Sequence, residues 1–159
     1  MLWFRDPAAR RLLALRYLPW FAALNLGWEA VHVPLYTLWS EASAGYIVFS
    51  IVHCTLGDIL IGSAAVTLAL IVAREQALER WRWRRIAALS AAVGTAYTVF
   101  SEWMNTKVLG NWAYEKAMPT LELGEIEIGW SPLLQWLLLP PLALYLSRRS
   151  WQPRWSGQV

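Results

Sequence analysis

The twelve arginines of this chain all fall in three clusters that are separated by long apolar runs. The clusters lie at Arg5/Arg10/Arg11/Arg16, at Arg74/Arg80/Arg82/Arg84/Arg85 and at Arg148/Arg149/Arg154. The two lysines, Lys107 and Lys116, lie in the remaining segment. Because segments on the cytoplasmic side of a membrane retain Lys and Arg, this arrangement predicts that both termini and the central basic loop are cytoplasmic.

The composition is too apolar for a soluble domain of this length. Of the 159 residues, 57% are hydrophobic and 16% are charged. A transmembrane helix needs about 20 apolar residues, because a backbone in lipid must satisfy its hydrogen bonds within the segment. We predict an all-α fold: a four-helix transmembrane bundle that forms a single domain over residues 1–159, with spans at about 17–39, 46–73, 86–105 and 130–147.

These features predict a multi-pass protein of the bacterial inner (cytoplasmic) membrane. The arginines flank apolar spans and form no separate basic domain, so we expect lipids with anionic headgroups, and not nucleic acid, as partners. One long loop, from about Thr106 to Gly129, would cap the outer end of the bundle. Within it, Leu121-Glu122-Leu123 and Glu125-Ile126-Glu127-Ile128 alternate around Gly124, which predicts a short hairpin or a folded cap.

Five ionisable side chains lie inside the predicted spans. Glu29 and His32 are in the first span, His53 and Asp58 in the second, and Glu102 in the third. Each costs roughly 2.5 to 3.5 kcal/mol to insert, so each requires a partner or a role. At a rise of about 1.5 Å per residue, all but Asp58 are expected in the outer half of the bundle, with Asp58 nearest the midplane.

Further polar residues extend these helix faces. Asn25 lies one turn from Glu29, Asn105 lies close to Glu102, and Gln135 adds an amide from the fourth span. We predict a polar pocket that opens toward the periplasmic side beneath the outer loop. Its predicted ligand-binding residues are Glu29, His32, His53, Asp58, Glu102, Asn25, Asn105, Gln135 and Trp103.

Metal binding is one chemistry that fits this set. Glu29-x-x-His32 is half of the paired Glu-x-x-His motif of di-iron bundles. With His53 and Glu102, these residues could complete a site for a divalent metal such as zinc, iron or manganese. A b-type haem between His32 and His53 fits less well, because Glu29 would lie beside the iron and no arginine lies in the outer half to meet the propionates.

Other functions fit the same residues. A buried carboxylic acid with a histidine relay could transfer protons on a lipid-like or isoprenoid substrate without a metal. Alternatively, the polar groups only bond one another, and the chain is a structural or assembly subunit of a larger membrane complex or a homo-oligomer. Small residues repeat along the third span and would provide a docking face, at Ala88/Ala92/Ala96 and Ser90/Gly94. The sequence leaves open whether the chain is an enzyme.

Several stretches of the chain resemble a family of small, uncharacterised four-helix bacterial membrane proteins. They are His53-Cys54-Thr55-Leu56-Gly57-Asp58, Tyr97-Thr98-Val99-Phe100-Ser101-Glu102-Trp103-Met104-Asn105, Trp112-Ala113-Tyr114 with Met118-Pro119, and Ser131-Pro132-Leu133-Leu134-Gln135-Trp136. This resemblance implies a four-helix membrane fold and no particular activity.

A shorter stretch, Gly110-Asn111-Trp112-Ala113-Tyr114, is similar to membrane carotenoid cyclases of the lycopene-cyclase type. Those enzymes carry a Pro-x-Glu-Glu element. The corresponding region here reads Ser131-Pro132-Leu133-Leu134-Gln135, so it lacks the carboxylates that such chemistry would need.

Overall fold

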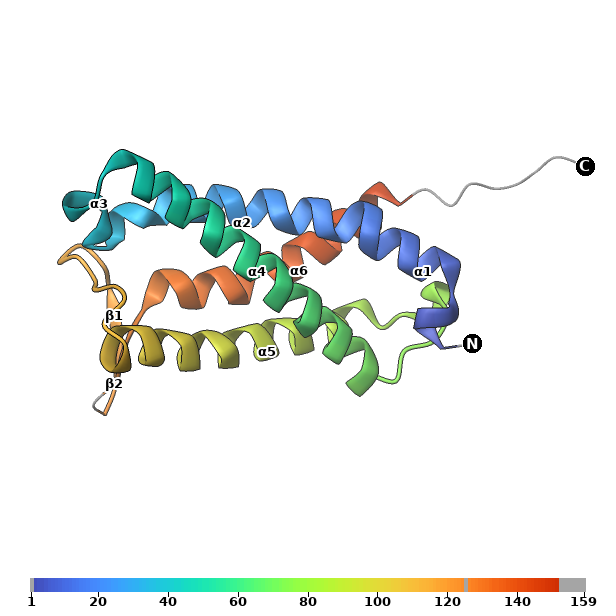
Figure 1. The fold of residues 1–159 in the computed structure, drawn as a ribbon. Coiled ribbons are helices and arrows are strands. Elements are labelled where there is room, and N and C mark those ends of the chain that lie inside the picture. Colours follow the sequence, from blue (N-terminus) through green and yellow to red (C-terminus); the bar gives the residue numbers. More distant parts are fainter. Residues whose placement is uncertain (1, 125, 152–159) are drawn as a thin grey trace, which may run out of the picture.

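The structure, a computed structural model that describes residues 2–124 and 126–151, is mostly helical (Figure 1). Four long helices dominate it: α2 (Leu18–His32), α4 (Ala44–Val72), α5 (Trp83–Trp103) and α6 (Trp130–Ser150). Each overlaps one of the four predicted spans, although α2 ends at His32, before the predicted end of the first span near residue 39. The shorter elements are α1 (Pro7–Leu12), α3 (Leu38–Glu41), three 3₁₀ turns at Trp3–Arg5, Val33–Leu35 and Leu78–Arg80, two π-helical turns at Leu13–Tyr17 and Met104–Val108, and the strands β1 (Thr120–Leu123) and β2 (Ile126–Gly129).

The first helical segment begins earlier than predicted. Asp6 caps α1 by accepting a hydrogen bond from the Ala8 backbone N–H at 2.9 Å, and Pro7 occupies the first turn, where its missing N–H costs nothing. The helix then continues through the π-helical turn into α2. Arginines interrupt the apolar pattern of this stretch, which is why hydrophobicity alone placed the start near residue 17.

In the part of the chain that the structure describes, only α4 is by itself long and apolar enough to cross a membrane. The segment α2 has 15 residues because the π-helical turn precedes it. The helices α5 and α6 are long enough, but they contain arginine, tryptophan, tyrosine and proline, all of which lower mean hydropathy.

The four long helices form a ring in which α2 and α5 each pack against both α4 and α6. Two glycines allow the closest approaches. A Cβ at Gly62 would collide with the Phe21 ring, and one at Gly94 would collide with the Trp136 ring. Ser90 and Gly94 therefore face the core, whereas the other small-residue stripe, at Ala88/Ala92/Ala96, is exposed.

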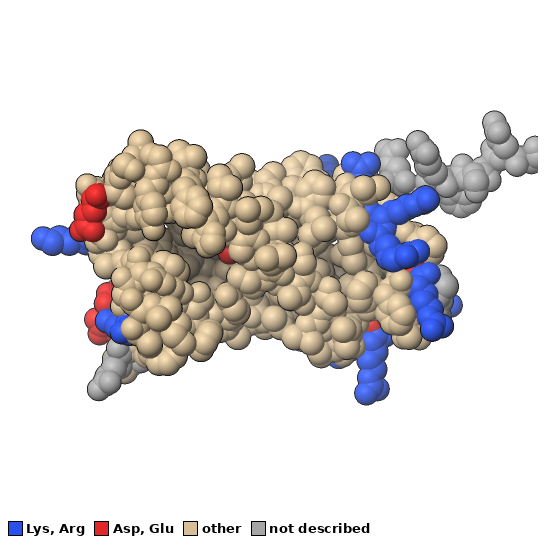
Figure 2. All heavy atoms as spheres, in the orientation of Figure 1, with Lys and Arg blue, Asp and Glu red and all other residues tan. Residues whose placement is uncertain are grey.

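Most exposed charged residues gather at the two ends of the bundle. The first turns of the chain, the α4–α5 connection and the end of α6 all lie at one end, so the three arginine clusters meet there (Figure 1). Arg154 lies outside the described residues. Figure 2 shows Lys and Arg concentrated at this end and an almost uncharged surface along the middle of the visible face. Exposed apolar side chains cover the outward faces of the long helices, including Val48, Val52, Leu56 and Leu60 of α4.

The opposite end is capped by the outer connection. Strands β1 and β2 pair antiparallel, with Thr120 opposite Gly129 and Leu123 opposite Ile126, which confirms the predicted hairpin. Glu125, which the sequence pattern included in this hairpin, lies outside the described residues. An antiparallel bridge between Tyr36 and Tyr114 ties the connection to the chain that follows α2.

Candidate functional site

The predicted polar residues of α2 share one buried face. Asn25, Glu29 and His32 are spaced four and three residues apart, which aligns them on a helix. Their exposed fractions are 1%, 8% and 8%, so the stripe points into the ring and not outward. Gln135 of α6 meets it there and is 3% exposed.

The side-chain amide of Gln135 is the centre of the site. Its Nε2 lies 3.0 Å from Asn25 Oδ1, 3.0 Å from Glu29 Oε1 and 2.8 Å from Asp58 Oδ2. The amide has two hydrogens, so it cannot give a separate hydrogen to each of three acceptor oxygens. The amide of Asn25 adds no donor at this point, because its own Nδ2 donates to the Phe21 carbonyl at 2.7 Å.

His32 extends the network toward the hairpin end. One ring nitrogen, Nε2, lies 3.1 Å from Glu29 Oε2, and the other, Nδ1, lies 3.0 Å from the Ser131 hydroxyl. A continuous series of hydrogen bonds therefore joins Ser131, His32, Glu29, Gln135 and Asp58 across α2, α4 and α6. We call these five residues and Asn25 the polar core. Within the described residues, no arginine or lysine forms an ion pair with it.

Glu102 of α5 belongs to a second cluster. It is 6% exposed and accepts a hydrogen bond from the Tyr114 hydroxyl, which in turn accepts one from the Gly129 backbone N–H at 3.0 Å. Burial, together with the Glu102 carboxylate, raises the pKa of Tyr114 above its ordinary value, so this hydroxyl remains a donor. The Tyr36 ring lies between the clusters, with its centroid 5.3 Å from that of His32 and 5.6 Å from that of Tyr114.

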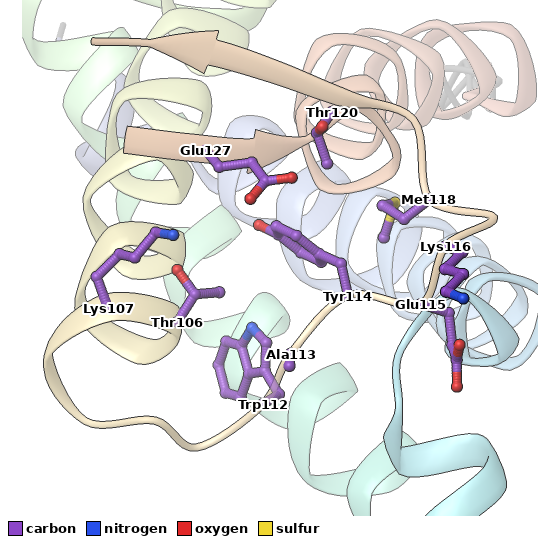
Figure 3. Close-up of a pocket in the computed structure, with 10 residues that line it drawn as sticks. All are labelled: Thr106, Lys107, Trp112, Ala113, Tyr114, Glu115, Lys116, Met118, Thr120 and Glu127. Carbon is purple, nitrogen blue, oxygen red and sulfur yellow. The ribbon is translucent and has the colours of Figure 1, made fainter. Parts of the chain in front are cut away.

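A cavity of about 440 Å³ lies within the outer connection (Figure 3). Both lysines of the chain, Lys107 and Lys116, line it from different sides, and Tyr114 lies between them. The remaining lining residues are Thr106, Trp112, Ala113, Glu115, Met118, Thr120 and Glu127. None of the predicted ligand-binding residues lines this cavity, but two of its lining residues, Tyr114 and Thr106, donate hydrogen bonds to Glu102.

Besides Glu102, three predicted site residues do not join the polar core. His53 is exposed, and its ring stacks on Phe49 at 5.5 Å. It lies five residues before Asp58, which on a helix turns it about 140° away from the face that Asp58 occupies. Asn105 instead bonds Ser101 and Asn111, and Trp103 packs on Phe100.

The predicted metal site is consequently not assembled. Among residues 2–124 and 126–151, no group of three His, Cys, Asp or Glu side chains is arranged to hold a metal ion. Of the predicted ligands Glu29, His32, His53 and Glu102, only the first two are hydrogen-bonded to each other. The haem arrangement between His32 and His53 fails for the same reason, since His53 faces outward.

Sequence reasoning missed Ser131 and Tyr114. Ser131 lies in the first turn of α6, where Gly129 occupies the cap position and the Ser131 hydroxyl bonds His32. Its spacing of four residues from Gln135 on the same helix was the signal that could have assigned it to the site. No comparable signal marks Tyr114, because its contact with Glu102 depends on how the outer connection folds.

Comparison of the chain with protein-family models, with curated proteins and with solved structures gave no match. The resemblances noted in the sequence therefore stay predictions.

Proposed function

We propose that this chain is a multi-pass protein of the bacterial inner membrane whose polar core is an acid–base site for a lipid-like ligand. In this proposal the helix ring is a four-helix transmembrane bundle, with both termini and the arginine end in the cytoplasm. Three features support it: arginines at one end, lysines at the other, and exposed apolar side chains between them.

The main support for an acid–base function is that the Gln135 amide has fewer hydrogens than it has neighbouring acceptor oxygens. Three acceptor oxygens surround an amide with two hydrogens, and two of those oxygens belong to carboxyl groups. A proton held between Glu29 and Asp58 supplies the missing hydrogen. It also leaves the pair with one negative charge instead of two in an apolar bundle where, among the described residues, no arginine or lysine is paired with it.

Asp58 is the carboxyl group of the polar core that a ligand can reach. It is partly exposed, whereas Asn25, Glu29 and Gln135 are buried. The neighbouring Gly57 has open space where a side chain would start. Figure 2 shows a hollow on the face that carries α4 and α5, toward the hairpin end, with an acidic side chain visible at its base.

The proposed chemistry is proton transfer. Asp58 donates the shared proton to a polar group of the bound ligand and takes a proton back from another position of the ligand. Glu29, which is hydrogen-bonded to His32, then shares the returned proton with Asp58. Nothing is oxidised or reduced, and no proton is gained or lost overall. His32 and Gln135 orient the two carboxyl groups.

The membrane topology is tested by cysteine labelling. Cys54 is the only cysteine, so a Cys54→Ser chain is a clean background for Lys116→Cys and Arg149→Cys. We expect a membrane-impermeant maleimide to label Lys116→Cys in spheroplasts, and to label Arg149→Cys only after lysis. Equal labelling of both positions in intact spheroplasts would refute the topology.

The acid–base site is tested by infrared spectroscopy of the purified protein. A protonated carboxyl group has a carbonyl band that a carboxylate lacks. We expect this band in the wild type and its loss in both Glu29→Gln and Asp58→Asn. For the ligand, lipids extracted from wild type and from Asp58→Leu, purified in the same detergent, are compared by mass spectrometry. Absence of the band, together with identical lipid content, would overturn the proposal.

A further inference from the structure

The connection between α4 and α5 forms an open pocket of about 250 Å³ at the arginine end. Its lining residues are Arg74, Glu75, Gln76, Arg80 and Arg82, so three arginines face one glutamate. The pocket lies far along the chain from the polar core and shares no residue with it. No step of the proposed proton transfer uses it.

Arg74 occupies a backbone conformation that favours glycine. Its φ is 53°, and among the described residues it is the only non-glycine with a positive φ. The end of α4 is closed there by two backbone hydrogen bonds, Arg74 N–H to the Ile71 carbonyl at 2.9 Å and Glu75 N–H to the Leu70 carbonyl at 3.0 Å. Glycine would close the helix equally well without Cβ strain, so the fold itself gives no reason for an arginine here.

A second arginine is fixed in the wall of the pocket. Arg82 Nε donates to Glu75 Oε1 at 2.9 Å, and its guanidinium also donates to the Ala73 carbonyl. Glu75 is 3% exposed and accepts a further bond from the Arg82 backbone N–H at 3.3 Å. This buried carboxylate neutralises Arg82 and holds it in place. Arg74 and Arg80 are exposed and form no ion pair within the described part of the chain, so their charges are available to a ligand.

We propose that this pocket binds the headgroup phosphate of an anionic phospholipid of the cytoplasmic leaflet. Guanidinium groups match the geometry of phosphate oxygens, and basic pockets beside membrane helices suit anionic headgroups. The pocket volume suits a phosphate with a short substituent. The proposal goes beyond the acid–base site and rests only on the membrane location, which the cysteine labelling tests separately.

The experiment uses Arg74→Gly, because glycine removes the charge and also relieves the backbone. The midpoint of thermal unfolding, Tm, is measured in a neutral detergent with added phosphatidylglycerol, phosphatidylcholine or inorganic phosphate. Arg84→Gln is the matched control, since Arg84 is an exposed arginine of the same end that does not line the pocket. Arg80→Gln is a second pocket variant.

We expect Arg74→Gly to unfold at or above the wild-type Tm in neutral detergent, which shows that the variant folds. Phosphatidylglycerol should raise the Tm of wild type and Arg84→Gln, and should bind Arg74→Gly and Arg80→Gln about fivefold more weakly. Equal losses in all three variants would show only diffuse attraction and overturn the site. A Tm rise with inorganic phosphate equal to that with phosphatidylglycerol would overturn the lipid as the occupant.

Discussion

Replacement of Asp58 by asparagine is expected to cost little stability if Glu29 and Asp58 share a proton. Asparagine has nearly the shape of a protonated aspartic acid, and its NH₂ group can donate to Glu29 while its carbonyl accepts from Gln135. The substitution therefore reproduces the proposed hydrogen-bond pattern with a fixed donor. Asp58→Leu keeps a similar volume but offers neither a donor nor an acceptor.

The magnitude follows from the contacts of the Gln135 amide. All three acceptor oxygens lie within 3.0 Å of Nε2, so after loss of the Asp58 carboxyl the two Gln135 hydrogens still have acceptors in Asn25 and Glu29. Glu29, however, loses the proton that it shares with Asp58 and is left as a buried carboxylate. A buried polar group without a partner costs about 1 to 3 kcal/mol, and a charged group such as the Glu29 carboxylate costs more. We expect a loss of roughly 2 to 4 kcal/mol in the free energy of unfolding for Asp58→Leu, and of less than about 1 kcal/mol for Asp58→Asn.

Unfolding is followed in detergent by the fluorescence of the twelve tryptophans. Gln135→Leu serves as the reference for loss of the whole centre and should cost at least as much as Asp58→Leu. If Asp58→Asn destabilises the protein as much as Asp58→Leu does, Asp58 must carry a negative charge in the native state. Proton sharing would then be wrong.

Three further predictions test the packing, the outer cluster and the boundary of the site. Gly62→Ala is expected to destabilise the bundle by about 1 to 3 kcal/mol, because the new methyl group would collide with the buried Phe21 ring. Gly57→Ala is the control, because its methyl group enters open space and should leave stability unchanged or raise it. Thermal unfolding measures both variants. Tyr114→Phe removes the hydroxyl that donates to Glu102 and accepts from the Gly129 N–H, so it should lower the free energy of unfolding by about 1 to 3 kcal/mol. It should also speed amide hydrogen exchange in the β1–β2 hairpin, and unchanged exchange would show that this hydroxyl does not stabilise the hairpin. His53→Ala should change the free energy of unfolding by less than about 0.5 kcal/mol and leave the lipid content unchanged, because His53 is exposed. A large loss in either measurement would show that His53 belongs to the site.

Much of the fold could be predicted because it depends on local signals. The long apolar runs mark the four long helices, and the alternation around Gly124 marks the hairpin. Position on a helix also places Asn25, Glu29 and His32 on one face, and the structure buries that face. These predictions succeed because helix and strand periodicity is a property of the chain itself.

The errors in the predicted metal and haem sites arose because residues were grouped by their depth along the helices. The direction in which each residue points around its helix was not considered. His53 and His32 were predicted at similar depth, but depth does not say which residue faces the axis of the ring. For α4 that choice was made by the packing of Gly62 against Phe21, together with the contact between Asp58 and Gln135. The resulting rotation of the helix turns His53 outward and removes the predicted metal site.

The sequence by itself determined which segments become helices, which end of each carries arginine and which face of α2 is polar. Only the tertiary structure decided that a glutamine of the last helix would meet carboxyl groups from two others, and that an arginine would take a glycine conformation beside a basic pocket. Periodicity and charge are local and can be read residue by residue. The meeting of Gln135, Glu29 and Asp58 depends on the rotation of three helices about their axes, which interlocking side chains fix only once the ring has closed.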